Sequence, residues 1–391
     1  MTAPSAVREP GLLDALALLP TYADELVLGA VRDTHRAVAR RSFRVVNRAT
    51  GEAARPAQLV HDGIASAVYV SMGAALRGAG RGLTRLGEAG IGPRLEDSST
   101  GRVLHSAVNG LIGARLREEN PQLALGTTVR VRGRAVPLTG EAVADAFPSA
   151  TERVVVLVHG LGEHEGHWEH DRYRLGGTYG STLAQEGGWT PVHLRINTGL
   201  AVAENGVAVT ALVQDLVDAW PVPVRQVALV GHSMGGLVLH AACAVATKAE
   251  QPWSERVSDV ITLGTPHFGA DLARVVRSGA GVLALVPEVA AFGRILEQRS
   301  PGIRDLERGL PDVAALPGAR YRLVSASLGA EDGVVGKVLG DLLVRPGSAA
   351  ADDRRFLRLF PGADLLHVHQ ADHFSLLNHP EVHDALRRWL T

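Results

Sequence analysis

The chain has 391 residues, 46% of them hydrophobic and 21% charged, which is the composition of an ordinary soluble globular protein with a large core. Its formal net charge of −1 excludes the basic surplus typical of a nucleic-acid-binding protein. The one cysteine, Cys243, excludes an intrachain disulfide, and its apolar helical surroundings predict a buried, inert thiol.

The N-terminal region, residues 1–122, is predicted to be helical, because its apolar residues recur at helical spacing between glycines and prolines. One basic helix face is formed by four arginines with a four-residue repeat, Arg32, Arg36, Arg40 and Arg44. We interpret this face as solvated surface, and contact with a membrane surface or a partner is the alternative. No secretory leader is recognisable, and the apolar run 12–19 is too short to span a bilayer, so we expect a cytoplasmic protein.

Residues 123–391 are predicted to form one α/β domain. The segments "TTVRVRG" and "RAVPL" alternate apolar and polar residues, as in a short antiparallel hairpin. Six short Val/Leu-rich runs follow, at 153–158, 191–196, 225–230, 257–263, 320–326 and 363–368. Helical stretches separate many of these runs, at 178–187, 204–219, 234–248 and 379–390. This alternation predicts a mostly parallel central sheet flanked by helices.

The clearest catalytic motif is "GHSMGG", which directly follows the run 225–230 and opens the helix at 234–248. A G-x-S-x-G sequence between a strand and a helix is typical of a strained turn that exposes a serine nucleophile. Side chains two residues before and after the serine would collide there, so Gly231 and Gly235 are needed. We therefore predict Ser233 as the nucleophile.

A serine hydroxyl needs a base, and the base needs an orienting carboxylate. On this kind of sheet the chain order is serine, acid, histidine. His373 follows the last predicted strand and is the predicted base, with His369 and His379 as competitors. The acid should follow the strand 320–326, where Asp332 and Asp341 both qualify.

The histidine-rich stretch "VHGLGEHEGHWEHD" at 158–171 has two interpretations. As a loop after the first strand of the domain, it would supply the Leu161 N–H as one oxyanion donor, with the Met234 N–H as the second. As a metal site it would use His167, His170 and a third ligand such as Glu163, but the HExxH spacing is absent. We favour the loop interpretation, in which His164, His167 and His170 are loop and surface residues and no metal is bound.

Four stretches resemble the α/β-hydrolase superfamily, and within it the lipase and esterase group that includes proteins of the GPI-inositol-deacylase type. They are "VHGLGEHEGHW", "RINTGLAVAENG", "VGHSMGGLV" and "TLGTPHFGADLA". The segment "GDLLVRPGSA" is similar to the acid loop of such enzymes, which favours Asp341 over Asp332, although Leu342 stands where glycine is usual. The resemblance covers about residues 150–391, implies the α/β-hydrolase fold, and aligns His373 with the catalytic base.

The resemblance implies a serine-dependent esterase or lipase that needs no cofactor and acts on an apolar, small-molecule or lipid-like ester. We expect residues 270–315 to form a helical lid, with an ordinary buried helix pair as the alternative, and we expect Trp168, His267 and Phe268 to line the substrate pocket. An acyltransferase or thioesterase would use the same acyl-serine, and a non-catalytic interaction protein on this fold is the alternative of another class. A nucleic-acid partner is not expected, and the oligomeric state is not visible in the sequence.

Overall fold

The computed structural model describes residues 10–18, 39, 43–44, 46–48, 52–92, 94–245, 249–269, 300–310, 312–327 and 355–390. The chain divides into two compact units. The first contains residues 1–101 and 286–298, and the second contains residues 102–285 and 299–391. The division therefore lies after Gly101, whereas the sequence pattern placed it between residues 122 and 123.

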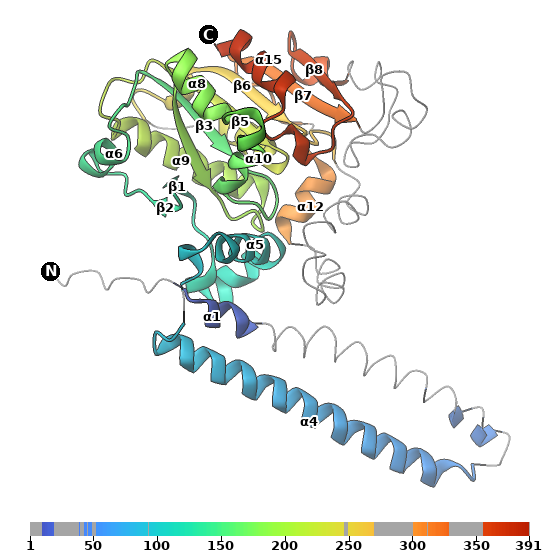
Figure 1. The fold of residues 1–391 in the computed structure, drawn as a ribbon. Helices are drawn as coiled ribbons and strands as arrows, with labels where there is room; N and C mark the ends of the chain where they lie inside the picture. Colours follow the sequence, from blue (N-terminus) through green and yellow to red (C-terminus); the bar gives the residue numbers. More distant parts are fainter. Residues whose placement is uncertain are drawn as a thin grey trace. The chain divides into compact units, whose positions relative to one another are not determined.

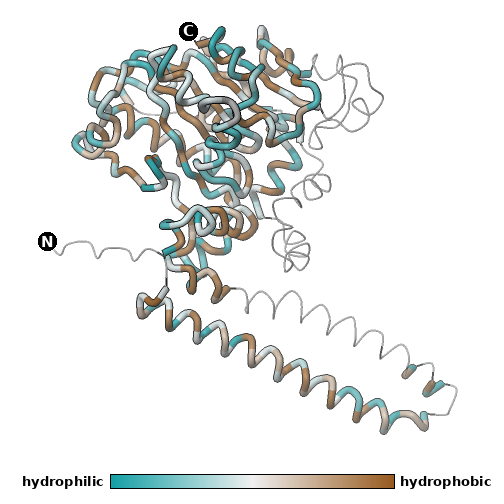
Figure 2. The backbone as a smooth tube through the Cα atoms, in the orientation of Figure 1, coloured by the Kyte–Doolittle hydropathy of each residue, from teal (hydrophilic) through white to brown (hydrophobic). Residues whose placement is uncertain are grey.

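The first unit contains the long helix α4 (Arg55–Glu88), which lies in the N-terminal region predicted to be helical. The short helix α1 (Leu12–Leu16) packs against it, and a Cβ on Gly87 would lie 2.4 Å from the Asp14 carboxylate. By length and composition alone, α4 could cross a membrane: its most apolar window has a mean hydropathy of 1.3 and is 11% buried (Figure 2). Of the predicted basic face, only Arg44 belongs to the described residues.

The second unit is built on an eight-stranded sheet in the order β2-β1-β4-β3-β5-β6-β7-β8 (Figure 1). The strands are β1 (Thr128–Val131), β2 (Arg134–Ala135), β3 (Arg153–Val158), β4 (Thr190–Arg195), β5 (Gln226–His232), β6 (Val257–Leu263), β7 (Arg320–Ser327) and β8 (Asp364–His369). β1 runs antiparallel to β2 and β4, and all other neighbours are parallel. The predicted hairpin and all six predicted strands are confirmed.

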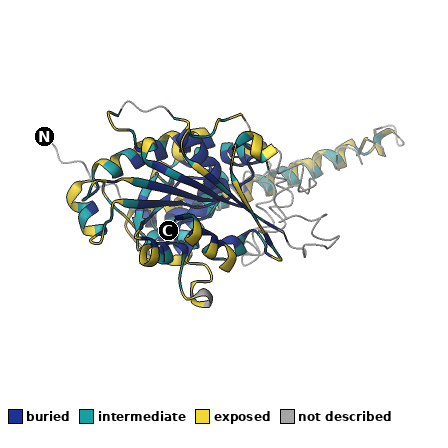
Figure 3. Cartoon of the chain, turned by 90° about the horizontal axis from the view of Figure 1, so that it is seen from above, coloured by how far each residue is buried: buried dark blue, intermediate teal, exposed yellow. Residues whose placement is uncertain are grey.

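Helices cover both faces of this sheet. The helices after α4 are α5 (Ser99–Glu119), α6 (Gly140–Ala146), α7 (Arg172–Leu175), α8 (Tyr179–Gly187), α9 (Val202–Asp218), α10 (Met234–Cys243), α12 (Pro301–Arg308) and α15 (Pro380–Leu390), with short 3-10 turns between them. Along β3, Val154 and Val156 enter the hydrophobic cluster under α9 and α10, whereas Val155 and Leu157 enter the cluster under α8 and α15. Because successive side chains of a strand point to opposite faces, an uninterrupted apolar run buries both faces. The inner strands are accordingly dark blue in Figure 3.

Helix α5 contacts the loops at the carboxyl ends of β3 and β4, which explains where the unit boundary falls. A Cβ on Gly110 would lie 2.9 Å from the Cα atom of Gly162, and one on Gly199 would lie 2.1 Å from the carbonyl oxygen of Asn109. Backbones meet here without intervening side chains, so glycine is required on both sides. Most of α5 is therefore part of the second unit rather than of a separate helical region.

Candidate active site

Ser233 occupies a strained turn between β5 and α10. Its backbone angles are φ 52° and ψ −124°, values rare for a residue with a side chain. A Cβ on Gly231 would lie 2.5 Å from Gly236, and one on Gly235 would lie 2.3 Å from the Val158 carbonyl oxygen. The predicted need for two flanking glycines is thus a property of the folded turn, and the turn places Ser233 at the N-terminus of α10.

The end of β6 anchors this turn. The Ser233 N–H donates to the Leu263 carbonyl at 2.8 Å, and the Thr265 hydroxyl donates to the Ser233 carbonyl at 2.9 Å. Both carbonyl and amide of the strained residue are therefore satisfied, as a buried backbone requires. The serine hydroxyl remains at the carboxyl edge of the sheet, where the positive end of α10 favours developing negative charge.

His373 lies beside the same strand end. A Cβ on Gly264, the residue after Leu263, would come within 2.8 Å of the His373 Nδ1 atom, and the His373 ring centroid is 4.6 Å from that of His232. His373 is therefore next to the residue that precedes Ser233 and next to the strand end that anchors Ser233. Its assignment as the base stays a prediction.

The competing histidines make other contacts. The His369 ring packs on His367 at 4.6 Å between centroids. His379 precedes α15, and its Nδ1 accepts the N–H of Glu381 at 3.3 Å, a contact that caps the start of this helix. Both candidate acids, Asp332 and Asp341, lie outside the described residues.

The loop after β3 forms a tight turn against Ser233. The Glu163 N–H donates to the Gly160 carbonyl at 3.2 Å, and Gly162 has a φ of 70°, the conformation that this turn position requires of glycine. A Cβ on Gly160 would lie 3.0 Å from the Cβ atom of Ser233. The predicted oxyanion loop therefore lies directly beside the predicted nucleophile.

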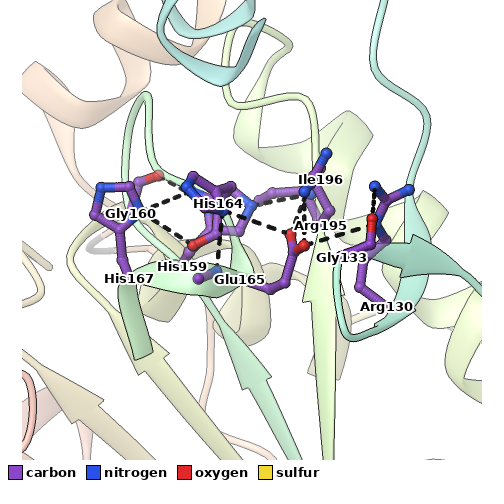
Figure 4. A network of polar contacts seen from close by, with 10 residues as sticks. Arg130, Gly133, His159, Gly160, His164, Glu165, His167, Arg195 and Ile196 are labelled. Carbon is purple, nitrogen blue, oxygen red and sulfur yellow. Dashed lines mark hydrogen bonds and ion pairs between the residues drawn. The ribbon is translucent and has the colours of Figure 1, made fainter. Parts of the chain in front are cut away.

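His159 fixes the orientation of the peptide group that carries the predicted oxyanion donor. Its Nε2 accepts the N–H of Ile196 at 3.2 Å, so the proton is on Nδ1, which donates to the Gly160 carbonyl at 3.0 Å (Figure 4). Burial lowers the pKa of His159 to about 4, which keeps this ring neutral. Because the peptide is planar and trans, the Leu161 N–H points away from the bound Gly160 carbonyl.

Neither predicted oxyanion donor forms a hydrogen bond with the part of the chain that the structure describes. The Leu161 N–H donates to no atom of these residues. The Met234 N–H belongs to the first residue of α10, where no preceding turn supplies an acceptor. Their role toward an oxyanion stays a prediction.

Two site residues were missed by the sequence reasoning, Glu163 as a carboxylate that orders the loop and His232 as its partner. Glu163 Oε2 accepts the Gly160 N–H at 2.8 Å and lies 3.0 Å from His232 Nδ1, and His232 Nε2 lies 3.2 Å from the His373 carbonyl oxygen. Burial raises the pKa of Glu163, but the charge and hydrogen bond of His232 outweigh it, and the pKa falls well below its usual range. In the sequence, the one feature that could have indicated this role is a histidine, His232, at the end of an otherwise apolar strand.

The remaining histidines of the 158–171 stretch are structural. His164 is buried, which corrects its interpretation as a surface residue, because its Nδ1 accepts the Gly166 N–H at 3.0 Å and its ring packs on His167. Burial, and then the neighbouring His167, lowers the pKa of His164 to about 3. His170 is exposed. No group of three metal-binding side chains occurs among the described residues.

The three predicted pocket residues lie in packed surroundings. Trp168 is buried near Tyr179 and accepts a hydrogen bond at its carbonyl from the Asn378 side chain at 2.8 Å. His267 is buried against Phe360, with ring centroids 4.8 Å apart, and Phe268 packs on Phe356. Their contact with substrate stays a prediction, and residues 270–299 of the predicted lid lie outside the described part of the chain.

Comparison with known proteins gives one family match. The family described as "PGAP1-like alpha/beta domain" matches residues 205–278, which include most of α9, the serine turn and β6. No curated protein matches the chain by sequence.

Among solved structures, the chain is similar to the mature lipase BlEst2 of Bacillus licheniformis, with 23% identity and a TM-score of 0.42, over 61% of this chain and 92% of that one. It is also similar to the esterase Pf2001 of Pyrococcus furiosus, with 16% identity and a TM-score of 0.42, over 62% and 84%. These sequence identities and TM-scores are too low to identify a substrate. The strand order of the chain itself and its glycine-flanked serine turn are those expected of the α/β-hydrolase fold, and the family match includes that turn.

Proposed function

We propose that the protein is a serine-dependent carboxylic ester hydrolase that acts on an apolar acyl ester. The observation that carries this proposal is the strained Ser233 turn. It lies against the loop after β3, and the Leu161 and Met234 N–H groups of this region have no partner among the described residues. The His373 ring packs on His232, the residue before Ser233. A structure maintains such strain where function requires it. A non-catalytic protein on this fold would have no use for this combination.

The proposed reaction passes through an acyl-enzyme. Ser233 Oγ attacks the ester carbonyl carbon while His373 takes the hydroxyl proton. The Leu161 and Met234 N–H groups stabilise the negative oxygen of the tetrahedral intermediate. The C–O bond to the alcohol breaks and His373 returns the proton to the departing alkoxide. Water then attacks the acyl-serine in the same manner, releasing the carboxylic acid and restoring Ser233, with Asp341 as the proposed carboxylate that orients His373.

The experiment compares the hydrolysis of short- and long-chain nitrophenyl esters by the wild type and by Ser233→Ala. Turnover should fall by at least about a thousandfold on loss of the nucleophile. A matched control is Ser258→Ala in β6, whose hydroxyl contacts only a strand carbonyl at 3.5 Å and should leave turnover unchanged. Covalent labelling of the wild type, but not of Ser233→Ala, by a fluorophosphonate would support the same nucleophile. Unchanged turnover in Ser233→Ala would overturn the proposal.

A further inference from the structure

Three parts of the site meet at one buried pair of side chains, Glu163 and His232. Glu163 belongs to the loop after β3, His232 is the last residue of β5, and His232 reaches the backbone of His373 before the C-terminal helix. Glu163 and His232 lie 69 positions apart in sequence, and both are buried. Among the described residues, the pair therefore joins the oxyanion loop, the serine turn and the base-bearing loop through side-chain contacts.

The protonation state of Glu163 and His232 can be inferred from the atoms that they contact. His232 Nδ1 faces a carboxylate oxygen and Nε2 faces a carbonyl oxygen, and a carbonyl oxygen can only accept. The same Glu163 Oε2 atom also accepts the Gly160 N–H at 2.8 Å, which favours an ionised carboxylate over a protonated one. With a proton on each ring nitrogen, His232 donates to the Glu163 carboxylate and to the His373 carbonyl. Its positive charge then lies beside the negative charge of Glu163.

We propose that Glu163 and His232 form a carboxylate–imidazolium pair that positions the oxyanion loop and the His373 loop around Ser233. The inference rests on the proposed ester hydrolysis and assigns both residues as positioning residues, because neither has to touch the substrate. Glu163 holds the Gly160 N–H, while His159 holds the Gly160 carbonyl, so the short segment before Leu161 is bound on both sides. His232 holds the backbone carbonyl of His373, with the His373 and Phe374 rings packed against it.

A glutamine at position 163 cannot reproduce these contacts. One atom, Oε2, receives both the Gly160 N–H and the His232 N–H. An amide oxygen in its place would leave the imidazolium without a counter-charge, and an amide nitrogen would face the Gly160 N–H donor. The first arrangement removes the charge pairing and the second breaks a hydrogen bond, so Glu163→Gln should displace the loop although the side chain keeps its size.

The kinetic test measures kcat and KM for nitrophenyl ester hydrolysis in Glu163→Gln, His232→Gln and the double variant. We expect kcat to fall about ten- to hundredfold in each single variant, with KM changed by less than about threefold, because misplaced donors weaken the transition state more than substrate binding. Residues that act as one unit are not additive, so the double variant should lose no more than the worse single variant. Wild-type kcat in Glu163→Gln, or multiplied losses in the double variant, would overturn the positioning role.

The matched control is Glu165→Gln, which removes a second buried carboxylate from the same loop. Glu165 pairs with Arg195 instead of with Gly160 and His232. This variant should lose stability, yet its folded fraction should keep kcat within about threefold of the wild type. Equal kcat losses in Glu165→Gln and Glu163→Gln would show a general effect of loop destabilisation and would overturn the specific role of the pair.

A spectroscopic test on the wild-type protein is independent of activity and of the folding of any Glu163 variant. In ¹⁵N-resolved NMR spectra, the ring assigned to His232 by its absence from His232→Gln should carry two N–H protons between about pH 5 and pH 9. A single N–H on that ring would overturn the ion pair. If Ser233→Ala retained turnover, the proposed function would fail, but the NMR measurement would still show whether Glu163 and His232 form an ion pair. If only the Glu163 and His232 variants retained turnover, the positioning role alone would fail.

Discussion

Arg195 and Glu165 form a buried ion pair in which Nε and Nη2 of the arginine donate to the two carboxylate oxygens, each at 2.6 Å. Arg195 ends β4, and Glu165 begins the 3-10 turn Glu165–Glu169 of the histidine-rich loop (Figure 4). Burial raises the pKa of Glu165, but the hydrogen bonds and charge of Arg195 lower it overall. Glu165 therefore ties the 3-10 turn to the end of β4, and it makes neither of the contacts that Glu163 makes to Gly160 and His232.

We expect Glu165→Gln to lower the free energy of unfolding by about 3–5 kcal/mol, because it leaves the Arg195 charge buried without its counter-charge. The double variant Glu165→Gln/Arg195→Met should lose less than the sum of the two single losses. Urea unfolding followed by circular dichroism measures both quantities. The exposed pair of Glu152 and Arg225, at 2.9 Å, provides the control: Glu152→Gln should cost less than about 1 kcal/mol. Similar costs at the two sites would contradict the assignment of a buried pair.

The second prediction concerns the serine turn. A Cβ on Gly235 would lie 2.3 Å from the Val158 carbonyl oxygen and 2.6 Å from that of His159, so Gly235→Ala must push β3 and α10 apart. We expect a loss of about 1–3 kcal/mol or more in stability, together with loss of ester turnover. Thermal unfolding and initial rates measure the two effects. Gly140→Ala, in α6, meets no atom within 4 Å and should be neutral or slightly stabilising. A fully active, stable Gly235→Ala variant would show that the turn does not need its glycines.

The strands and the serine turn could be predicted because their causes are local in sequence. A strand buried on both faces needs an apolar run, and β3 was located at Arg153–Val158 from that pattern alone. The turn at Ser233 needs glycine at fixed offsets, and Gly231 and Gly235 stand at those offsets. In both cases the residues that cause the structure lie within a few positions of the residues that adopt it.

The role of the histidine-rich loop could not be predicted to the same depth, because its partners are distant in sequence. Glu165 meets Arg195 across 30 positions and Glu163 meets His232 across 69. Nothing in the stretch itself indicates which of its histidines are buried, so His164 was interpreted as a surface residue. Helix α5 was assigned to the N-terminal region for a similar reason, since helical periodicity does not indicate which neighbour a helix packs against.

The third prediction decides between the two candidate acids, which lie outside the described residues. Asp341→Asn should lower kcat by roughly ten-thousandfold, because an amide cannot hold the productive tautomer of His373 or stabilise its charged form. Asp332→Asn should retain kcat within about threefold if Asp332 is a turn residue. Both variants are assayed with the same nitrophenyl ester, with circular dichroism as the check of folding. The reverse ranking would assign the triad to Asp332.

The last prediction concerns stability in mild acid. Burial lowers the pKa of several of the described histidines, to about 4 for His159 and His240 and, with contributions from neighbouring histidines, to about 3 for His164 and His267. In the unfolded chain these groups have their ordinary pKa of about 6.5. The unfolded state therefore binds more protons below about pH 6.5, and the free energy of unfolding should fall as the pH drops from there toward 4.

Each of these histidines contributes up to about 1.4 kcal/mol per pH unit within that window, so the combined slope should exceed that of any single group. Urea unfolding at a series of pH values between about 8 and 5 measures the slope. His267→Gln removes one buried imidazole and should make the slope shallower, whereas His170→Gln, which changes an exposed side chain, should leave it unaltered. A free energy of unfolding that stays constant or rises on acidification would mean that these imidazoles take up protons in the folded protein, which their burial opposes.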